Sequence, residues 1–441
     1  MSATDPAGLV PDTTLNIRQA AFIGVGAMVG AGIFSLLGAA GEVAGAAVWI
    51  SFLLAGLVAG LQGYSFAKFG ARYPSAGGLL EYVARGFGDG HFTGIIAWLV
   101  LATNAIVTGM VAVSFGSYAS SALNLHGDAP PKIFALLVII VMTVLNVVGS
   151  QAVARIQTLI VFVVIGILAI FAVATLSHLH PHLLAFSGYP PLRKIISSVA
   201  LTFFAFLGFG VITFTAKDLP QPKRQLPRAM FLALGIATIV YVAVSVGVFG
   251  TLSVEKVIES GGTALAVAAQ PVLGQAGYWL MTVTALFATS GATNAGLYPA
   301  AGLCEQMAKT GHFPPPLGRR LGGRLPAGLL TTAVLAAVLA VGFDLSSIAS
   351  IGSAIALIVF GLVTVGHLRV RSETGARTWI LVLGVASTSV VLVAFALTTL
   401  VNEPGTAIAM VVIVLVSIAI DFIWKRRSSA QRGGRSREAL A

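Results

Sequence analysis

The chain has 441 residues, of which 57% are hydrophobic and only 9% are charged. Globular proteins carry about 25% charged residues, so this composition places most of the chain in a lipid bilayer. It excludes a soluble multidomain enzyme of this length. The single cysteine, Cys304, excludes an internal disulfide framework.

The chain begins with a polar stretch, residues 1–16, which contains Asp5 and Asp12 and no positively charged segment. A cleaved signal peptide has such a segment before its apolar core. We therefore expect residues 1–16 to form a cytoplasmic tail, and the first apolar segment to remain as a helix.

A membrane-spanning helix needs about 20 predominantly apolar residues. By that measure the sequence predicts an all-α membrane protein with twelve spans, at residues 17–40, 44–69, 92–122, 132–149, 153–176, 195–216, 229–251, 274–307, 327–343, 346–369, 377–400 and 403–424. We expect a transporter core with an eleventh helix over 17–400, a twelfth helix over 403–424, and a basic tail over 425–441. The Arg-, Ser- and Gly-rich composition of this tail is typical of disorder.

The basic residues predict the orientation of the chain. With a cytoplasmic N-terminus, only four of the 26 Lys and Arg residues fall in outer loops: Lys132, Arg193, Lys194 and Lys256. An excess of basic residues on the cytoplasmic side is the rule for membrane proteins, so both termini are predicted to lie inside. The net charge of +11 is then a topology signal and gives no support to nucleic-acid binding.

The first span carries four glycines in nine positions, from Gly24 to Gly32, where an ordinary spanning helix would carry Leu, Ile or Val. Such a run predicts a helix that is interrupted within the membrane and exposes backbone amides and carbonyls at a substrate site. The alternative is that the glycines only allow two helices to pack closely.

The sixth span has a second group of mid-span glycines, Gly208 and Gly210, among aromatic and small polar residues. Two interrupted spans that stand five helices apart indicate an inverted five-plus-five repeat with a substrate site between its halves. We expect the first repeat over about 17–176 and the second over about 195–369. This correspondence favours a transporter over the packing alternative.

Three stretches together resemble the amino acid–polyamine–organocation (APC) superfamily of permeases. They are residues 26–34 in the first span, residues 72–78 in the loop after the second span, and residues 203–229 in the sixth span and the Pro-rich loop after it. The resemblance implies a LeuT-type fold, twelve helices with the first and sixth discontinuous, and alternating access for amino acids or related amines. The loop stretch leads into a predicted short helix over 79–87, for which we favour a scaffold role.

The resemblance also implies a substrate site in the first and sixth helices. Their amides and carbonyls would bind the carboxylate and the ammonium of the substrate, and two aromatic rings would form a gate and a side-chain pocket. The implied carboxylate-binding residues are Gly30, Ala31 and Gly32. The implied carbonyl acceptors are Ala27, Met28, Phe204 and Leu207. Phe204 and Phe206 are the implied rings, and Gly208 belongs to the second interruption.

Three polar residues at membrane depth could complete this pocket: Asn104 in the third span, and Ser290 and Asn294 in the eighth. Each of them could instead form hydrogen bonds between helices.

Two departures from the family pattern concern specificity and coupling. Gly210 stands where many relatives carry an acidic residue, which argues against arginine and polyamines and for a neutral substrate. Val164 aligns with a position that is Lys in some proton-coupled members, which puts proton symport in doubt. Exchange, or coupling through Glu81, Asp218 or a loop histidine, remains open, and Lys217 with Asp218 forms either a gate ion pair or an exposed pair.

Other chemistry has little support in the sequence. His178, His180 and His182 alternate in an outer loop without a nearby carboxylate or cysteine, so we favour a solvated loop over a metal site. We predict a non-enzymatic secondary transporter of small or medium neutral amino acids, without metal or cofactor, in the cell membrane. Its partners would be the substrate, the bilayer and, as a candidate, protons. The alternatives are another amine or organic solute as cargo, or a channel or sensor on the same fold.

Overall fold

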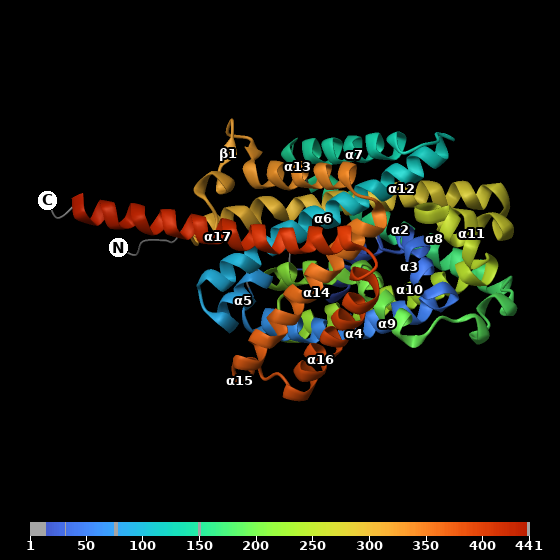
Figure 1. Ribbon diagram of the computed structural model, residues 1–441, viewed down its shortest axis with the longest axis horizontal. Coiled ribbons are helices and arrows are strands. Elements are labelled where there is room, and N and C mark those ends of the chain that lie inside the picture. Colours follow the sequence, from blue (N-terminus) through green and yellow to red (C-terminus); the bar gives the residue numbers. More distant parts are fainter. Residues whose placement is uncertain (1–14, 31, 75–77, 149–150, 439–441) are drawn as a thin grey trace, which may run out of the picture.

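The structure, a computed structural model, describes residues 15–30, 32–74, 78–148 and 151–438, with side chains omitted at 151–158, 217 and 428–438. Most of its helices run along the long axis of the molecule (Figure 1). The longer ones are α1 (Ile17–Val29), α4 (Val48–Arg72), α6 (His91–Ala122), α7 (Ala129–Val148), α8 (Gln151–Ser177), α9 (Leu192–Thr202), α10 (Pro222–Thr251), α12 (Ala264–Lys309), α13 (Ala327–Gly342), α14 (Leu345–Arg369), α16 (Thr378–Phe395) and α17 (Pro404–Glu438).

Shorter elements connect or interrupt these helices. The short α-helices are α2 (Gly32–Ser35), α3 (Leu37–Ala44), α5 (Leu79–Phe87), α11 (Val254–Ser260) and α15 (Arg371–Thr374). The 3₁₀ segments are η1 (Gly45–Ala47), η2 (Pro181–Leu184), η3 (Phe186–Gly188), η4 (Phe203–Asp218), η5 (Gly261–Thr263) and η6 (Pro315–Gly318), and η7 (Ala396–Leu400) is a π-helix. A small antiparallel hairpin pairs β1 (Arg320–Leu321) with β2 (Leu325–Pro326).

Ten helices within the described residues are long and apolar enough to cross a membrane. They correspond to ten of the twelve predicted spans. The other two predictions fall on α12, which carries more polar residues, and on α13, which has only 16 residues. The count of twelve therefore stays a prediction.

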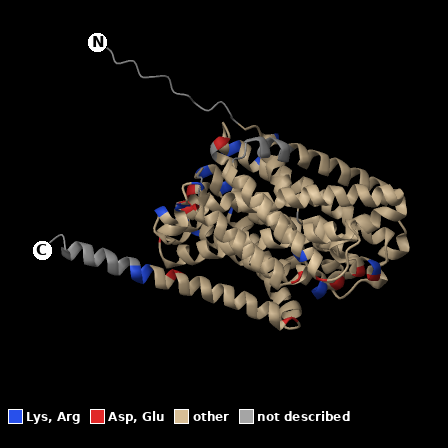
Figure 2. Cartoon of the chain, turned by 90° about the horizontal axis from the view of Figure 1, so that it is seen from above, with Lys and Arg blue, Asp and Glu red and all other residues tan. Residues whose placement is uncertain are grey.

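Charged side chains gather at the two ends of the bundle and leave its middle apolar (Figure 2). The end that holds α5, α15 and the basic part of α17 is also the end at which Leu15 precedes α1. There the Leu15 amide donates a hydrogen bond of 2.9 Å to the carbonyl of Asp218, at the end of η4. The first and sixth predicted spans thus meet at this basic end.

The last helix is longer than predicted. We expected its span to end at residue 424 and a disordered tail to follow, but the helical backbone of α17 continues to Glu438. Extending an existing helix adds one hydrogen bond for each residue that is ordered. Starting a new helix has an unfavourable free energy of nucleation, because the first turn orders several residues for a single hydrogen bond. Composition alone therefore gave the wrong prediction for this tail.

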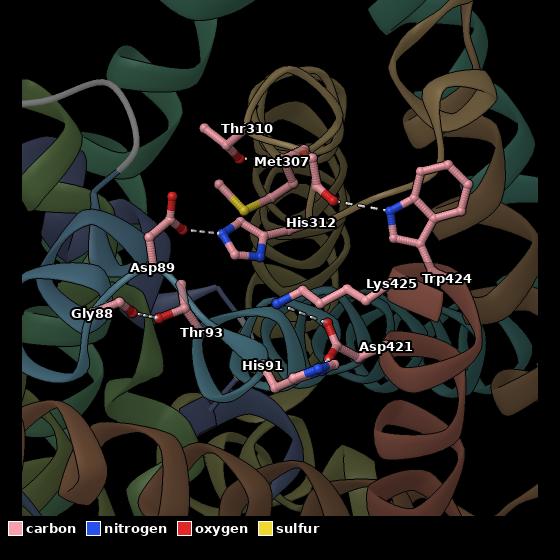
Figure 3. A network of polar contacts seen from close by, with 11 residues as sticks. Gly88, Asp89, His91, Thr93, Met307, Thr310, His312, Asp421, Trp424 and Lys425 are labelled. Atoms are coloured by element: carbon pink, nitrogen blue, oxygen red, sulfur yellow. Dashed lines mark hydrogen bonds and ion pairs between the residues drawn. The ribbon is translucent and has the colours of Figure 1, made fainter. Parts of the chain in front are cut away.

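A buried carboxylate holds α17 against α6 (Figure 3). The Asp421 side chain is fully buried; one of its oxygens lies 2.6 Å from Nδ1 of His91, and the other lies 3.7 Å from Nζ of Lys425. Gly94 makes room for this carboxylate, because a Cβ added there would lie 1.9 Å from Asp421 Oδ1. Trp424 adds a hydrogen bond of 2.9 Å from Nε1 to the carbonyl of Gly311.

The predicted short helix after the second span is present as α5. Its Glu81 forms an ion pair of 2.9 Å with Arg85, one turn later on the same helix. The preceding loop is anchored by Tyr73, whose hydroxyl donates a hydrogen bond to the Glu373 carboxylate, and this bond raises the pKa of Tyr73. The loop is thus tied to α15, in keeping with a scaffold role. Residues 75–77 of the loop motif lie outside the described residues.

Candidate functional site

The first predicted interruption separates α1 from α2. α1 ends at Val29, Gly30 forms the turn, and α2 begins at Gly32; Ala31 lies outside the described residues. The last carbonyls of an α-helix and the first amides of the next have no partner within their own helix. This junction therefore offers acceptors at the end of α1, including Ala27 and Met28, and donors at the start of α2.

The second interruption takes a different form from the first. The α-helix of α9 ends at Thr202, and the chain continues as a 3₁₀ helix of 16 residues to Asp218. Runs of 3₁₀ helix beyond three or four residues are uncommon and often mark a functional hinge. The sequence indicated that the α-helix stops here, but it did not indicate that a tighter helix would replace it.

Glycines bring the two interrupted helices into backbone contact. A Cβ added at Gly32 would lie 2.0 Å from the Cβ of Ala205. A Cβ added at Gly208 would lie 2.5 Å from the carbonyl oxygen of Ala27 and 2.6 Å from the amide nitrogen of Met28. Only glycine fits at these two crossing points. The sequence offered two explanations for the mid-span glycines, an interruption of the helix and close packing between helices, and both are present here.

The two predicted aromatic residues lie on different sides of η4. The Phe204 ring packs toward α14, where a Cβ added at Gly352 would lie 3.0 Å from it. Phe206 packs against Tyr241 of α10, with 5.1 Å between ring centroids. Both rings are buried, and Leu207 between them is half-buried. Phe204 therefore faces α14, whereas Phe206 faces α10.

A small apolar cavity lies beside the first interruption, between α1, α8 and α12. Its volume is about 20 Å³, which is room for roughly one water molecule. The lining residues are glycines and apolar side chains, namely Gly26, Val29, Gly30, Ile160, Val161, Val164, Phe287, Ala288, Gly291 and Ala292. Val164, predicted from the family pattern to replace a lysine, thus lies next to the interruption.

The three predicted polar residues take part in three separate hydrogen bonds. The Asn294 side chain accepts a hydrogen bond of 2.6 Å from Asn146 of α7. This bond joins two helices, which is the alternative role predicted for Asn294. The Ser290 hydroxyl donates to the carbonyl of Phe287 within its own helix. Asn104 is half-buried in α6, and its carbonyl accepts a hydrogen bond from the hydroxyl of Thr108.

The coupling and specificity candidates differ in burial: Val164 is buried, Gly210 and Glu81 are half-buried, and Asp218 is exposed. Gly210 is half-buried, and a Cβ added there would meet no atom within 4 Å. Asp218 is exposed, and Glu81 is paired with Arg85 on α5. The Lys217 side chain lies outside the described residues, so its predicted pairing with Asp218 is not described.

Two buried hydrogen bonds that sequence reasoning missed support the second half of the first span. The hydroxyl of Tyr118 in α6 donates a hydrogen bond of 3.0 Å to the carbonyl of Phe34, and the Ser35 hydroxyl donates to Ser114. Both α6 residues lie within an apolar span, where a tyrosine or serine gives no signal of its partner.

A buried histidine was also missed. His367 of α14 is fully buried, its Nδ1 lies 2.8 Å from the hydroxyl of Ser65 in α4, and its Nε2 lies 2.7 Å from the hydroxyl of Thr374. Its ring lies against Phe69, with 4.1 Å between centroids. The sequence signal was a histidine near the end of a predicted span, which by default is a candidate functional residue.

The arrangement can bind a small zwitterion through its backbone. The amides at the start of α2 suit an anion, since a helix N-terminus carries partial positive charge. The last carbonyls of α1, which have no partner within their own helix, suit an ammonium group. The side chains at the crossing of α1 and η4 are small or apolar, so the backbone dominates the polar chemistry there.

Comparison with known proteins agrees with this geometry. A family model described as "Amino acid permease" matches residues 15–424. The inner membrane transport protein YbaT of Escherichia coli is 32% identical over 417 residues, which cover 94% of this chain and 97% of that protein. The branched-chain amino acid permease BcaP of Lactococcus lactis is 29% identical over 393 residues, covering 82% of each chain.

A solved structure confirms the fold. A manganese transporter of Eremococcus coleocola superposes with a TM-score of 0.64 and 14% sequence identity, covering 96% of this chain and 97% of that one. At this identity the likeness concerns the fold alone. The predicted LeuT-type arrangement is thereby confirmed, and the site residues within it stay predictions.

Proposed function

We propose that this chain, which belongs to the amino acid permease family, transports small or medium neutral amino acids by alternating access. The observation that carries the proposal is the crossing of α1 and η4, where Gly32 and Gly208 bring the interrupted backbones together. There the substrate carboxylate would bind the amides of Gly30, Ala31 and Gly32. The ammonium group would bind the carbonyls of Ala27, Met28, Phe204 and Leu207.

The preference for a neutral side chain rests on Gly210. A cationic substrate in a low-dielectric site needs a compensating charge, since an unpaired buried charge is costly. Gly210 supplies none, although a Cβ added at this position would meet no atom within 4 Å. The branched-chain amino acid permease among the relatives supports an apolar or small side chain as the preferred cargo.

We propose transport as an exchanger or as a proton symporter, with exchange favoured by the cavity beside Gly30. Val164 and its neighbours line that cavity with apolar groups, so they provide no titratable side chain at the interruption. Proton relays within membranes usually rely on such side chains. If protons are coupled, Glu81 and Asp218 are the first candidates.

The protein is a multi-pass membrane protein, and we place it in the cell membrane with both termini in the cytoplasm. The distribution of basic residues supports this orientation. The E. coli relative is named as an inner membrane transport protein.

A second cargo class is supported by another relative. A protein of Bacillus subtilis named as a methylthioribose transporter is 27% identical over 319 residues, covering 68% of each chain. An organic solute of that kind lacks the amino acid zwitterion, so it would not need both the amides and the carbonyls of the α1–α2 junction.

Uptake of radiolabelled substrate into proteoliposomes tests these alternatives. We expect saturable uptake of a neutral amino acid that depends on amino acid preloaded inside the vesicles, which is exchange. Uptake into empty vesicles driven only by an inward proton gradient would establish symport. A rate linear in substrate concentration would contradict transport by alternating access, and uptake of methylthioribose without any amino acid uptake would move the assignment to the second cargo class.

A further inference from the structure

A groove of about 480 Å³ lies on the outside of the bundle, where α9 packs against α16 and η7. This volume is within the range of small-molecule binding sites. The lining residues come from the first turn of α9 and from one side of α16 and η7: Arg193, Ile196, Ser389, Val390, Val393, Ala394, Leu397 and Thr398.

The α16 side of the groove is a straight stripe of residues spaced about one helical turn apart. Val390, Val393 and Leu397 lie along it, with 56%, 57% and 70% of their surface exposed. From Ser389 to Thr398 a helix rises by about 13 Å. One leaflet of a bilayer contributes roughly 15 Å of hydrocarbon, so the groove has about the length of an acyl chain within one leaflet.

A positively charged side chain, that of Arg193, lies at the end of the groove that is nearer to the membrane surface. Arg193 is the second residue of α9, is exposed, and forms no ion pair or hydrogen bond with any described residue. At the same end of the molecule, Lys256 is already paired with Glu259 at 2.9 Å. The Arg193 guanidinium is thus available for an anion, and its planar fork suits a phosphate in a bidentate contact.

The inner wall of the groove connects it to an interrupted helix. The Thr398 hydroxyl, in the π-helical turn η7, donates a hydrogen bond to the hydroxyl of Ser197 in α9. π-Helical turns within α-helices are rare and frequently lie at functional sites. Because α9 leads directly into η4, a ligand in this groove would contact the first half of the interrupted sixth span.

We propose that this groove binds an anionic glycerophospholipid, with its phosphate on Arg193 and one acyl chain along Ile196, Val390, Val393 and Leu397. The positive charge of Arg193 at the end of the groove favours an anionic headgroup, and the apolar stripe of α16 and η7 contacts the acyl chain. The lipid bridges α9 and α16 and stabilises their contact. This inference concerns a site away from the α1–η4 crossing, and its test requires no transported substrate.

The experiment measures the melting temperature of purified, delipidated protein in detergent as phosphatidylglycerol or phosphatidylcholine is added. A ligand that binds only the folded protein raises this temperature. We expect phosphatidylglycerol to raise it more than phosphatidylcholine. Arg193→Gln should reduce the effect of phosphatidylglycerol to that of phosphatidylcholine, and Val393→Trp, which fills the groove, should remove most of both effects.

Two matched variants separate this site from general lipid contact. Lys194→Gln removes a neighbouring charge that does not line the groove, and Val411→Trp enlarges a comparably exposed valine of α17. Both should respond to the two lipids as the unmodified protein does. Equal losses in Lys194→Gln and Arg193→Gln, or an unchanged preference in Arg193→Gln, would overturn the proposal.

Folding of each variant is checked by its elution profile and its melting temperature without added lipid. If Val393→Trp fails that check, the count of tightly bound phosphatidylglycerol molecules by native mass spectrometry on Arg193→Gln decides. Loss of one bound lipid relative to Lys194→Gln supports the site, and an unchanged count contradicts it.

Discussion

Gly208 of the second interrupted helix lies directly on the backbone of Ala27 in the first. A Cβ at position 208 would be 2.4 Å from the carbonyl carbon of Ala27 and 2.5 Å from its oxygen. No flexible side chain could yield there, because the neighbouring atoms belong to the backbone. The contact therefore sets how closely α1 and η4 approach, and it determines the space in which the α1 carbonyls are presented.

Replacing Gly208 with alanine should push α1 and η4 apart. Overpacking of this kind typically costs about 1–3 kcal/mol of folding stability, and we expect a lower melting temperature together with reduced uptake in proteoliposomes, because the α1 carbonyls are displaced. Gly235→Ala is the matched control, because a Cβ there meets nothing within 4 Å and the residue lies within α10. Equal uptake in the two variants would show that the contact has no functional role.

Gly210→Glu should widen specificity toward cationic amino acids. A Cβ added at Gly210 would meet no atom within 4 Å, and a carboxylate there would offset the charge of a lysine or arginine side chain. We expect both amino acids to inhibit counterflow in the variant and not in the unmodified protein. Gly210→Gln has the same shape without the charge; if it binds lysine as well as Gly210→Glu does, the electrostatic explanation is wrong.

Tyr118→Phe should weaken the second half of the first span. The substitution removes the hydrogen bond to the Phe34 carbonyl and leaves that carbonyl buried without this donor, which costs about 1–3 kcal/mol. We expect a lower melting temperature and a higher KM for uptake. The control Tyr298→Phe, at an exposed position of α12, should change neither the melting temperature nor the KM. If Tyr118→Phe leaves the KM unchanged, α2 is positioned by other contacts.

Gly94→Ala should loosen the attachment of α17. The new Cβ would lie 1.9 Å from Asp421 Oδ1 and 3.3 Å from His312 Nδ1, so the carboxylate must shift, which disturbs its contact with His91. We expect a clear drop in melting temperature, on the scale of about 1–3 kcal/mol for overpacking. Gly90→Ala, where the added Cβ meets no atom within 4 Å, serves as the comparison. A Gly94→Ala protein as stable as Gly90→Ala would mean that α17 is held mainly by its apolar contacts.

His367 and Ser65 should be energetically coupled. Their side chains form a buried hydrogen bond between α14 and α4, and contacting residues in one network usually show interaction energies of about 0.5–3 kcal/mol. A double-mutant cycle with Ser65→Ala and His367→Gln, followed by thermal unfolding, measures this coupling. Additive effects of the two substitutions would show that the bond contributes little to stability.

The membrane class, the approximate span positions and the two interruptions could be predicted from the sequence. Apolar segments of sufficient length must lie in lipid, and basic residues must avoid it, so both patterns are readable without a structure. Glycines in the middle of such segments predict an interruption from local sequence alone, since each weakens the helix that contains it. The predicted helix over 79–87 followed in the same way from local turn chemistry and is present as α5.

The partners of each side chain were decided only by the tertiary structure. In a helix that is apolar on all sides, lipid-facing and core-facing residues look alike, so no periodicity shows that Phe206 faces Tyr241 or that Asn294 faces Asn146. The same reason hid the bond from Tyr118 to Phe34. The sequence by itself determined where the backbone is interrupted, because that depends on local residue types. Only packing between distant helices decided what each interruption faces.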